Sequence, residues 1–74
     1  LAIQFPAAHK SPDGVIQFYR ADNKSLDQDH PISLDGIGRQ FFFVNDFEKG
    51  KWTIKIFWDW DGTSYFAEKE WISP

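Results

Sequence analysis

The sequence predicts an all-β fold, a small antiparallel immunoglobulin-like β-sandwich of about six to seven strands. Three observations predict it. Two runs of alternating apolar and polar residues, 50–60 and 63–72, are joined by Asp61-Gly62, a pair typical of a tight β-hairpin. Turn residues recur about every 8–12 residues, which is the spacing of a β-sandwich. No segment keeps apolar residues at helical spacing over three turns, so we expect essentially no helix.

The other expected strands are short and are separated by loops that contain Pro, Gly, Asp and Asn. Pro6 ends the first strand because it has no N–H to donate to a sheet. The polar segment 21–29 contains one apolar residue, Leu26, which we expect to anchor this loop in the core. Asp22 and Asp27 are expected to accept backbone N–H bonds there. The strands are expected at 1–5, 15–20, 30–35, 39–44, 50–60 and 63–72.

The two-residue turn also fixes the register of the final hairpin. It places Trp60 opposite Thr63, Trp58 opposite Tyr65, Phe57 opposite Phe66, Lys55 opposite Glu68 and Trp52 opposite Trp71. Opposed aromatic rings and opposite charges stabilise an antiparallel pair. Because side chains alternate along a strand, Phe57 and Phe66 point away from the face that carries Trp58 and Tyr65. Apolar residues on both faces indicate either a second layer or an outer surface for a partner.

We expect one domain, residues 1–74, because a chain of 74 residues is close to the lower size limit for a core that folds without disulfides or a bound metal. There is no Cys, so no disulfide or zinc-thiolate site is available. Apolar burial must therefore hold the fold, and 19% aromatic residues supply it. The predicted core consists of Phe18, Leu26, Ile32, Leu34, Trp52, Ile54, Ile56, Trp58, Tyr65 and Trp71.

The net charge of the chain and the length of its apolar runs argue against some classes of function. The net charge of −3 and scattered basic residues argue against a nucleic-acid partner, which would need a clustered basic face. No apolar run approaches the roughly 20 residues of a membrane-spanning helix, and no signal-peptide pattern is present. The chain does not begin with Met. We therefore expect a fragment of a longer protein, from which an upstream targeting or membrane-anchoring segment has been removed.

One motif resembles a catalytic signature. Residues 59–63 (DWDGT) match the D-x-D-G-T pattern of haloacid-dehalogenase-type phosphatases, in which the first Asp is the nucleophile. In that family the motif follows a continuously apolar parallel strand and precedes a helix. Here Lys51, Thr53 and Lys55 alternate with apolar residues, and 64–72 predicts a returning strand. We therefore interpret the motif as a hairpin turn and expect no enzymatic activity and no catalytic residue.

Histidines and tryptophans are the remaining candidates for binding. His9 and His30 are weak candidates for a metal site, but without Cys or Met they cannot form a soft copper site, and we expect no cofactor. The four Trp residues could form a carbohydrate platform, although a core this small must bury most of them. Trp60, beside the hairpin turn, is the one expected outside. The predicted contact residues are therefore Trp60, Phe57 and Phe66.

A longer pattern runs along the chain. It comprises 15–20 (VIQFYR), then Asp22, Lys24, Leu26 and Asp27, then 31–34 (PISL), 50–54 (GKWTI), Trp58, Asp61-Gly62 and Tyr65-Phe66. In order and spacing it resembles the FixH (CcoH-like) family, with its strand ending in Tyr-Arg-Pro, its x-D-x-K-x-L-D turn and its G-x-W and W-x-x-D-G-x-x-Y hairpin. Residues 1–6 resemble the family's first soluble strand. Ala21 replaces the family's usual Pro, so the turn after Arg20 is less rigidly set.

This resemblance implies a periplasmic domain tethered to the inner membrane by an upstream helix that is absent from this chain. Members of the family are associated with assembly of the cbb-type cytochrome c oxidase, beside a copper-transporting ATPase and other membrane proteins. The family has no catalytic residues to carry over. We expect a non-enzymatic assembly factor that acts by protein contact. The alternative is a generic extracytoplasmic binding module, for carbohydrate or protein, that uses exposed hairpin aromatics.

Overall fold

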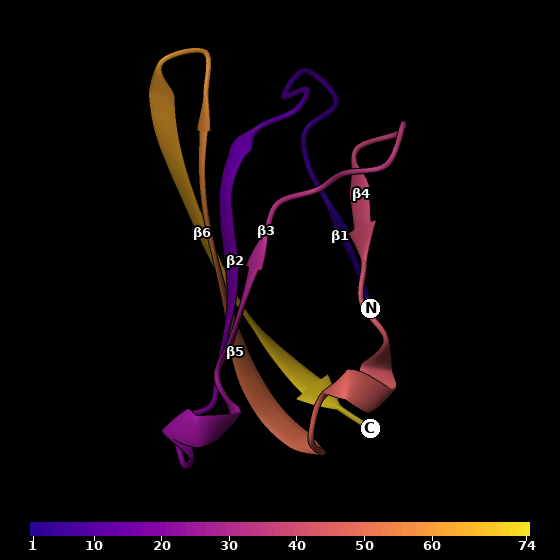
Figure 1. The fold of residues 1–74 in the computed structure, drawn as a ribbon, viewed down its shortest axis with the longest axis vertical. Coiled ribbons are helices and arrows are strands. Elements are labelled where there is room, and N and C mark those ends of the chain that lie inside the picture. The colour runs from indigo at the N-terminus through magenta and orange to yellow at the C-terminus, as the bar shows by residue number, and fades with distance from the viewer.

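The computed structural model describes residues 1–74 and confirms a small all-β fold of two antiparallel sheets. The four-stranded sheet has the order β3-β2-β5-β6, and the two-stranded sheet pairs β1 with β4 (Figure 1). The only helical segments are two 3-10 turns. The elements are β1 (Ala2–Gln4), β2 (Asp13–Tyr19), η1 (Lys24–Leu26), β3 (Gln28–Pro31), β4 (Arg39–Phe41), η2 (Val44–Asp46), β5 (Gly50–Trp60) and β6 (Thr63–Ser73).

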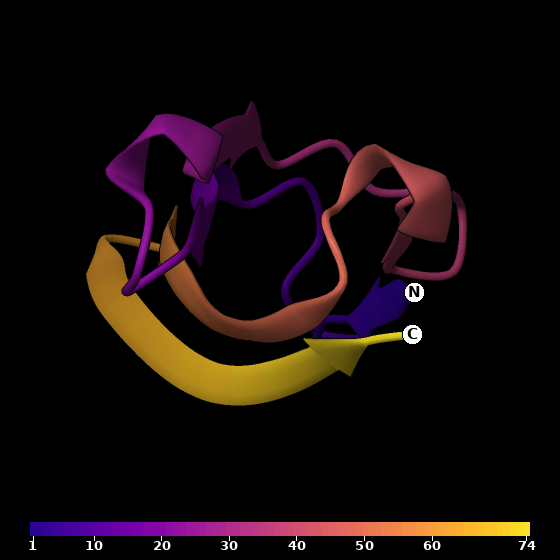
Figure 2. The same cartoon turned by 90° about the horizontal axis from the view of Figure 1, so that it is seen from below.

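The hairpin of β5 and β6 forms as predicted. All five predicted cross-strand pairs occur, from Trp60 with Thr63 to Trp52 with Trp71. The turn residues Asp61 and Gly62 have φ angles of 50° and 76°, the positive values that a two-residue hairpin turn requires. Both strands curve strongly, so the sheet forms a trough around the core (Figure 2). The long hairpin is therefore the framework on which the rest of the chain packs.

The core lies between the inner face of this trough and the two-stranded sheet. Ile16 and Phe18 of β2 are fully buried, and Trp52 and Ile54 of β5 lie beside them. Phe5, which follows β1, and Phe47, which follows η2, complete the buried cluster. Rings meet edge to face here: those of Phe47 and Trp52 are 5.5 Å apart at 84°. The thin core is thus built largely from interlocking aromatic side chains.

The predicted core is largely confirmed. Phe18, Trp52 and Ile54 are buried, while Tyr65 is half-buried and stacks on Trp58. The other predicted members pack against the cluster, including Leu26, which anchors the polar loop as expected. They are Leu26, Ile32, Leu34, Ile56, Trp58 and Trp71. The predicted core did not include three buried members, namely Phe5, Ile16 and Phe47.

Three predicted strands have the wrong boundaries. The second strand is β2 (Asp13–Tyr19) and not 15–20, because Asp13 and Gly14 already pair with Asp59 and Trp58 of β5. The third strand is β3 (Gln28–Pro31) and not 30–35. Beyond Pro31 the Gln40 side chain replaces a strand partner, because its amide accepts from the Ser33 N–H at 2.8 Å and donates to the Pro31 carbonyl at 3.2 Å. The fourth strand ends at Phe41 and not at Val44, because Phe43 caps the 3-10 turn η2.

Candidate protein-contact surface

One face of the four-stranded sheet points away from β1 and β4, and we call it the outer face. Four residues from its four strands lie side by side on this face and form what we call the apolar row. They are Pro31 of β3, Val15 of β2, Phe57 of β5 and Phe66 of β6, each in register with the next. Phe57 is 41% exposed and Phe66 is 56% exposed, and their ring centroids are 4.9 Å apart. The row is therefore a continuous apolar strip on the surface.

Carboxylates lie on both sides of the apolar row. Towards the hairpin turn, Asp13 of β2 is directly opposite Asp59 of β5, an arrangement of like charges that destabilises a sheet. On the other side, Glu68 is opposite Lys55, as predicted, but the Lys55 ammonium lies 5.0 Å from the centre of the Tyr19 ring. None of these three carboxylates forms a salt bridge. The row is thus bordered by carboxylates that form no salt bridge, with Lys55 opposite one of them.

The structure separates the three predicted contact residues. Phe57 and Phe66 lie together on the outer face, but Trp60 belongs to the inner-facing set with Trp58. Trp60 is half-buried, and its ring stacks on that of His9 with centroids 4.5 Å apart and an interplanar angle of 11°. One ring face of Trp60 is therefore covered, which leaves the Phe57–Phe66 pair as the exposed part of the predicted set.

His9 lies among three aromatic rings at the turn end of the hairpin. Besides Trp60, it contacts Tyr65 at a centroid distance of 4.7 Å, and the Trp58 Nε1–H donates to His9 Nδ1 at 3.1 Å. This bond places the proton of the neutral imidazole on Nε2. This contact could not be predicted from the sequence, because His9 and Trp60 come from distant segments that only the tertiary fold brings together.

Replacing His9 by alanine should uncover this aromatic group. We expect the His9→Ala variant to stay folded with roughly 1–2 kcal/mol less stability, since it loses a ring contact and a hydrogen bond. Its tryptophan fluorescence should shift to the red as Trp58 and Trp60 meet water. The control is Lys10→Ala, a change at an exposed neighbour. An unshifted emission maximum for His9→Ala would contradict the contact.

His30 lies in a different aromatic environment. Its ring is 5.6 Å from that of Phe18 and 5.1 Å from that of Phe42, and its Nε2 lies 3.0 Å from the side-chain oxygen of Gln28. His9, in contrast, packs on the hairpin aromatics. No group of three or more His, Cys, Asp or Glu side chains is placed to hold a metal ion. The geometry therefore offers His9 and His30 packing partners and no shared ligand set.

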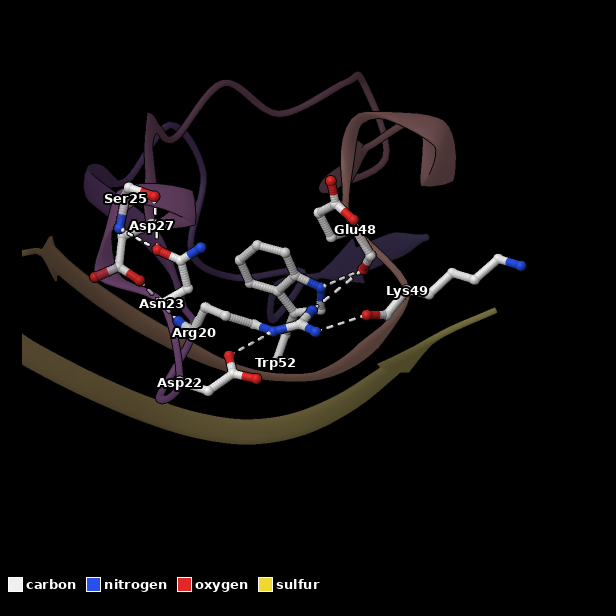
Figure 3. A network of polar contacts seen from close by, with 8 residues as sticks. All are labelled: Arg20, Asp22, Asn23, Ser25, Asp27, Glu48, Lys49 and Trp52. Carbon is white, nitrogen blue, oxygen red and sulfur yellow. Dashed lines mark hydrogen bonds and ion pairs between the residues drawn. The ribbon is translucent and has the colours of Figure 1, made fainter.

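Arg20 is the centre of a polar network at the opposite end of the sheet (Figure 3). Its guanidinium donates to the carbonyls of Glu48 at 3.3 Å and Lys49 at 2.7 Å, and to the Asp22 carboxylate at 3.1 Å. Its backbone N–H donates to Asp27 Oδ1 at 2.7 Å. The expected backbone bond is thus confirmed for Asp27, whereas Asp22 binds the Arg20 side chain instead. The network ties the loop of η1 to the start of β5.

Trp52 and Gly50 complete this network. The Trp52 Nε1–H donates to the same Glu48 carbonyl at 2.9 Å, and the Arg20 guanidinium lies 5.0 Å from the centre of the Trp52 ring. Gly50 has a φ of +112°, and a Cβ there would lie 2.7 Å from Arg20 Nη2. Glycine suits both the positive φ and the close approach of the Arg20 guanidinium. Most residues that carry the FixH resemblance in this region therefore have a structural role in the fold.

A surface hollow of about 520 Å³ lies between the loop after β1 and the turn before β4, lined in part by Pro6, His9 and Ile37. Asp35 lies in its wall and accepts from the backbone N–H groups of Arg39 and Ile37. The Arg39 N–H bond is the main cause that holds the pKa of Asp35 below its ordinary value. Because Asp35 is bonded to its own turn, this carboxylate shapes the wall and is not a free reactive group.

The D-x-D-G-T motif lies at the hairpin turn. Asp59 is near the end of β5 and accepts a hydrogen bond from the Ser64 hydroxyl. Asp61 is the first turn residue, and the chain returns as β6 from Thr63. The antiparallel hairpin predicted for these residues is confirmed, and neither the parallel strand nor the helix of a phosphatase motif is present.

Comparison with protein families, with curated proteins and with solved structures finds no match to this chain. The structure also contains no helix with the length and apolar character needed to cross a membrane. The two sheets and the outer face therefore define the chain only as a small antiparallel β-domain with an apolar strip on its surface.

Proposed function

We propose that this domain is a non-enzymatic protein-contact module and that its contact surface is the outer face around Phe57 and Phe66. The observation that carries the proposal is the apolar row. Isolated exposed apolar residues are normal on a protein surface, but a strip that crosses four adjacent strands in register is not. Its two aromatic members are of the residue class that contributes most to protein interfaces.

The order and spacing of the motif residues support a more specific proposal. The chain acts as the periplasmic part of a FixH-like, membrane-anchored assembly factor for the cbb-type cytochrome c oxidase, beside a copper-transporting ATPase. The absence of Cys and Met favours contact with a protein over handling of copper by this domain. Carbohydrate binding by hairpin aromatics is less favoured, because His9 covers one ring face of Trp60, the residue nearest the turn.

The proposal is tested in a bacterium that carries this gene. Deleting the gene should lower cbb-type oxidase activity in membranes, and the full-length wild-type protein should restore it. We expect the double variant Phe57→Ser/Phe66→Ser to fail to restore activity, because it removes the exposed aromatic pair. The measurement is oxygen consumption by isolated membranes, with the level of each variant measured in the same membranes.

The matched control is Phe41→Ser/Phe43→Ser. Both residues are exposed, Phe41 at 61% and Phe43 at 80%. Phe41 is the last residue of β4, in the other sheet, and Phe43 follows that strand. This control should restore oxidase activity. Normal oxidase activity in the deletion strain would refute the role in oxidase assembly. Full restoration by the Phe57/Phe66 double variant would refute the outer face as the contact surface.

A further inference from the structure

The apolar row ends at the longest free strand edge in the molecule. β6 (Thr63–Ser73) pairs with β5 on one side and has no neighbour on the other. In a hairpin with a two-residue turn, Trp60 and Thr63 form the hydrogen-bonded closing pair. The N–H and C=O groups of alternate residues, among them Ser64, Phe66 and Glu68, therefore point to the free edge. None of these groups makes a backbone bond elsewhere in the chain.

The other edges offer much less. β3 has four residues and ends at Pro31, and the Gln40 side chain occupies the adjoining backbone groups. β1 and β4 have three residues each. A partner that pairs with this domain through its backbone would therefore use β6.

Only part of the β6 edge is protected against pairing. Residues 68–70 are Glu-Lys-Glu, and charges on an edge strand are a common device against indiscriminate association. Lys69 even occupies an inner-face position, opposite the buried Ile54. Residues 63–67 (TSYFA), in contrast, carry no charge. The longer uncharged part of the edge is thus the one that contains Phe66, where the apolar row reaches the free side of the sheet; the other, 71–73, is shorter and is followed by Pro74.

The charges next to Phe66 indicate what kind of strand fits. Glu68 follows Phe66 on the same face and has no salt bridge. Ser64 precedes Phe66 on that face and is opposite Asp59, which in turn is opposite Asp13. A strand added to β6 would place one side chain beside Phe66 and the next two on that face beside Glu68 and Ser64, with Asp59 on the strand beyond Ser64.

We infer that the free edge of β6 binds an extended segment of a partner protein in which an apolar residue is flanked, two positions away on each side, by basic residues. The apolar side chain lengthens the apolar row beyond Phe66. One basic side chain pairs with Glu68, and the other extends across Ser64 towards Asp59. Backbone bonds to the edge supply affinity, and the side chains supply specificity. This inference rests on the proposed protein-contact function and names the chemistry of the partner.

A second copy of the chain is the alternative occupant, and the charges disfavour it. Pairing two β6 strands about Phe66 would place Glu68 of one copy beside Ser64 of the other, next to Asp59. It would therefore bring Glu68 of one copy towards Asp59 of the other, on a chain whose net charge is already −3.

The probe is a blocked synthetic peptide, Thr-Lys-Thr-Phe-Thr-Lys-Thr, titrated into the ¹⁵N-labelled chain and followed by NMR. We expect amide shifts confined to β6 and its outer-face neighbours, centred on Phe66, with binding that weakens as salt is added. A companion peptide with Glu in place of both Lys residues should bind at least about tenfold more weakly.

A charge reversal makes the test sharper. Glu68→Lys should weaken binding of the Lys peptide and strengthen binding of the Glu peptide, whereas Glu48→Lys, an exposed control near η2, should change neither. The inference is refuted by no binding at about 1 mM peptide, by equal binding of both peptides, by shifts away from β6, or by a wild-type dimer paired through β6. Failure here leaves the oxidase assay of the Phe57/Phe66 variant unaffected, so the two proposals fail separately.

Discussion

Replacing Trp52 by alanine is expected to remove most of the stability of the domain. Trp52 is only 1% exposed and is the largest fully buried side chain. Removing a buried Trp typically costs about 3–5 kcal/mol. A domain of this size has a total stability of only about 5 kcal/mol. The variant also loses the indole bond to the Glu48 carbonyl and the ring beneath the Arg20 guanidinium, so the loop of η1 and the start of β5 separate together.

Urea denaturation followed by far-ultraviolet circular dichroism measures this effect. The informative control is Trp52→Phe, which keeps an aromatic ring in the core but has no N–H to donate. We expect it to fold and to lose about half as much stability, because the Arg20 guanidinium still donates to the Glu48 carbonyl. If Trp52→Ala stays within about 1 kcal/mol of the wild type, the assignment of Trp52 to the centre of the core is wrong.

The hairpin could be predicted from sequence because all of its determinants are local. Asp61-Gly62 provides the positive φ angles, and the alternation on each side fixes both register and faces. That alternation places Phe57 and Phe66 together on the face opposite Trp58 and Tyr65. Whether a second layer covers this face depends on tertiary packing, and the structure leaves both rings exposed.

Those neighbours could not be predicted, because they depend on pairing between distant segments. Val15 joins the apolar row through the register of β2 with β5, about 40 residues away. Phe47 belongs to a loop that carries no strand pattern, yet it is buried. The third strand was misplaced for a similar reason, since the Gln40 side chain satisfies backbone groups that a strand would otherwise pair. A side chain that takes the place of a neighbouring strand leaves no periodic pattern in the sequence.

The Arg20 network changes how the family resemblance should be interpreted. Arg20, Asp27, Gly50 and Trp52 belong to the matched motifs, and the structure brings them into one set of contacts. Residues that hold two loops together would be needed by any protein with this fold, whatever it contacts. The motifs at these positions therefore reflect the packing of this fold, and a partner must be argued from the outer face.

The second large loss of stability is expected when Gly14 is replaced by alanine, because the central strands β2 and β5 leave no room for a side chain at Gly14. A Cβ on Gly14 would lie 1.9 Å from the Phe57 carbonyl oxygen and 2.7 Å from the Trp58 Cα, both backbone atoms of β5. Backbone atoms cannot rotate away as a flexible side chain can, so β2 and β5 must separate at this level. We expect Gly14→Ala to lose about 3 kcal/mol or more. The apolar row should also be disturbed, since Val15 and Phe57 are paired beside this contact.

Urea denaturation and amide hydrogen exchange of β2 and β5 measure this loss, and Gly36→Ala is the matched control. A Cβ on Gly36 meets no atom within 4 Å, and its φ is not positive, so the same change should alter stability by no more than about 0.5 kcal/mol. The two variants have the same effect on the flexibility of the unfolded chain. Their difference therefore isolates the clash between β2 and β5. Equal stability of the two variants would mean that these strands approach less closely than the structure requires, and Val15 could then not be placed beside Phe57 in the apolar row.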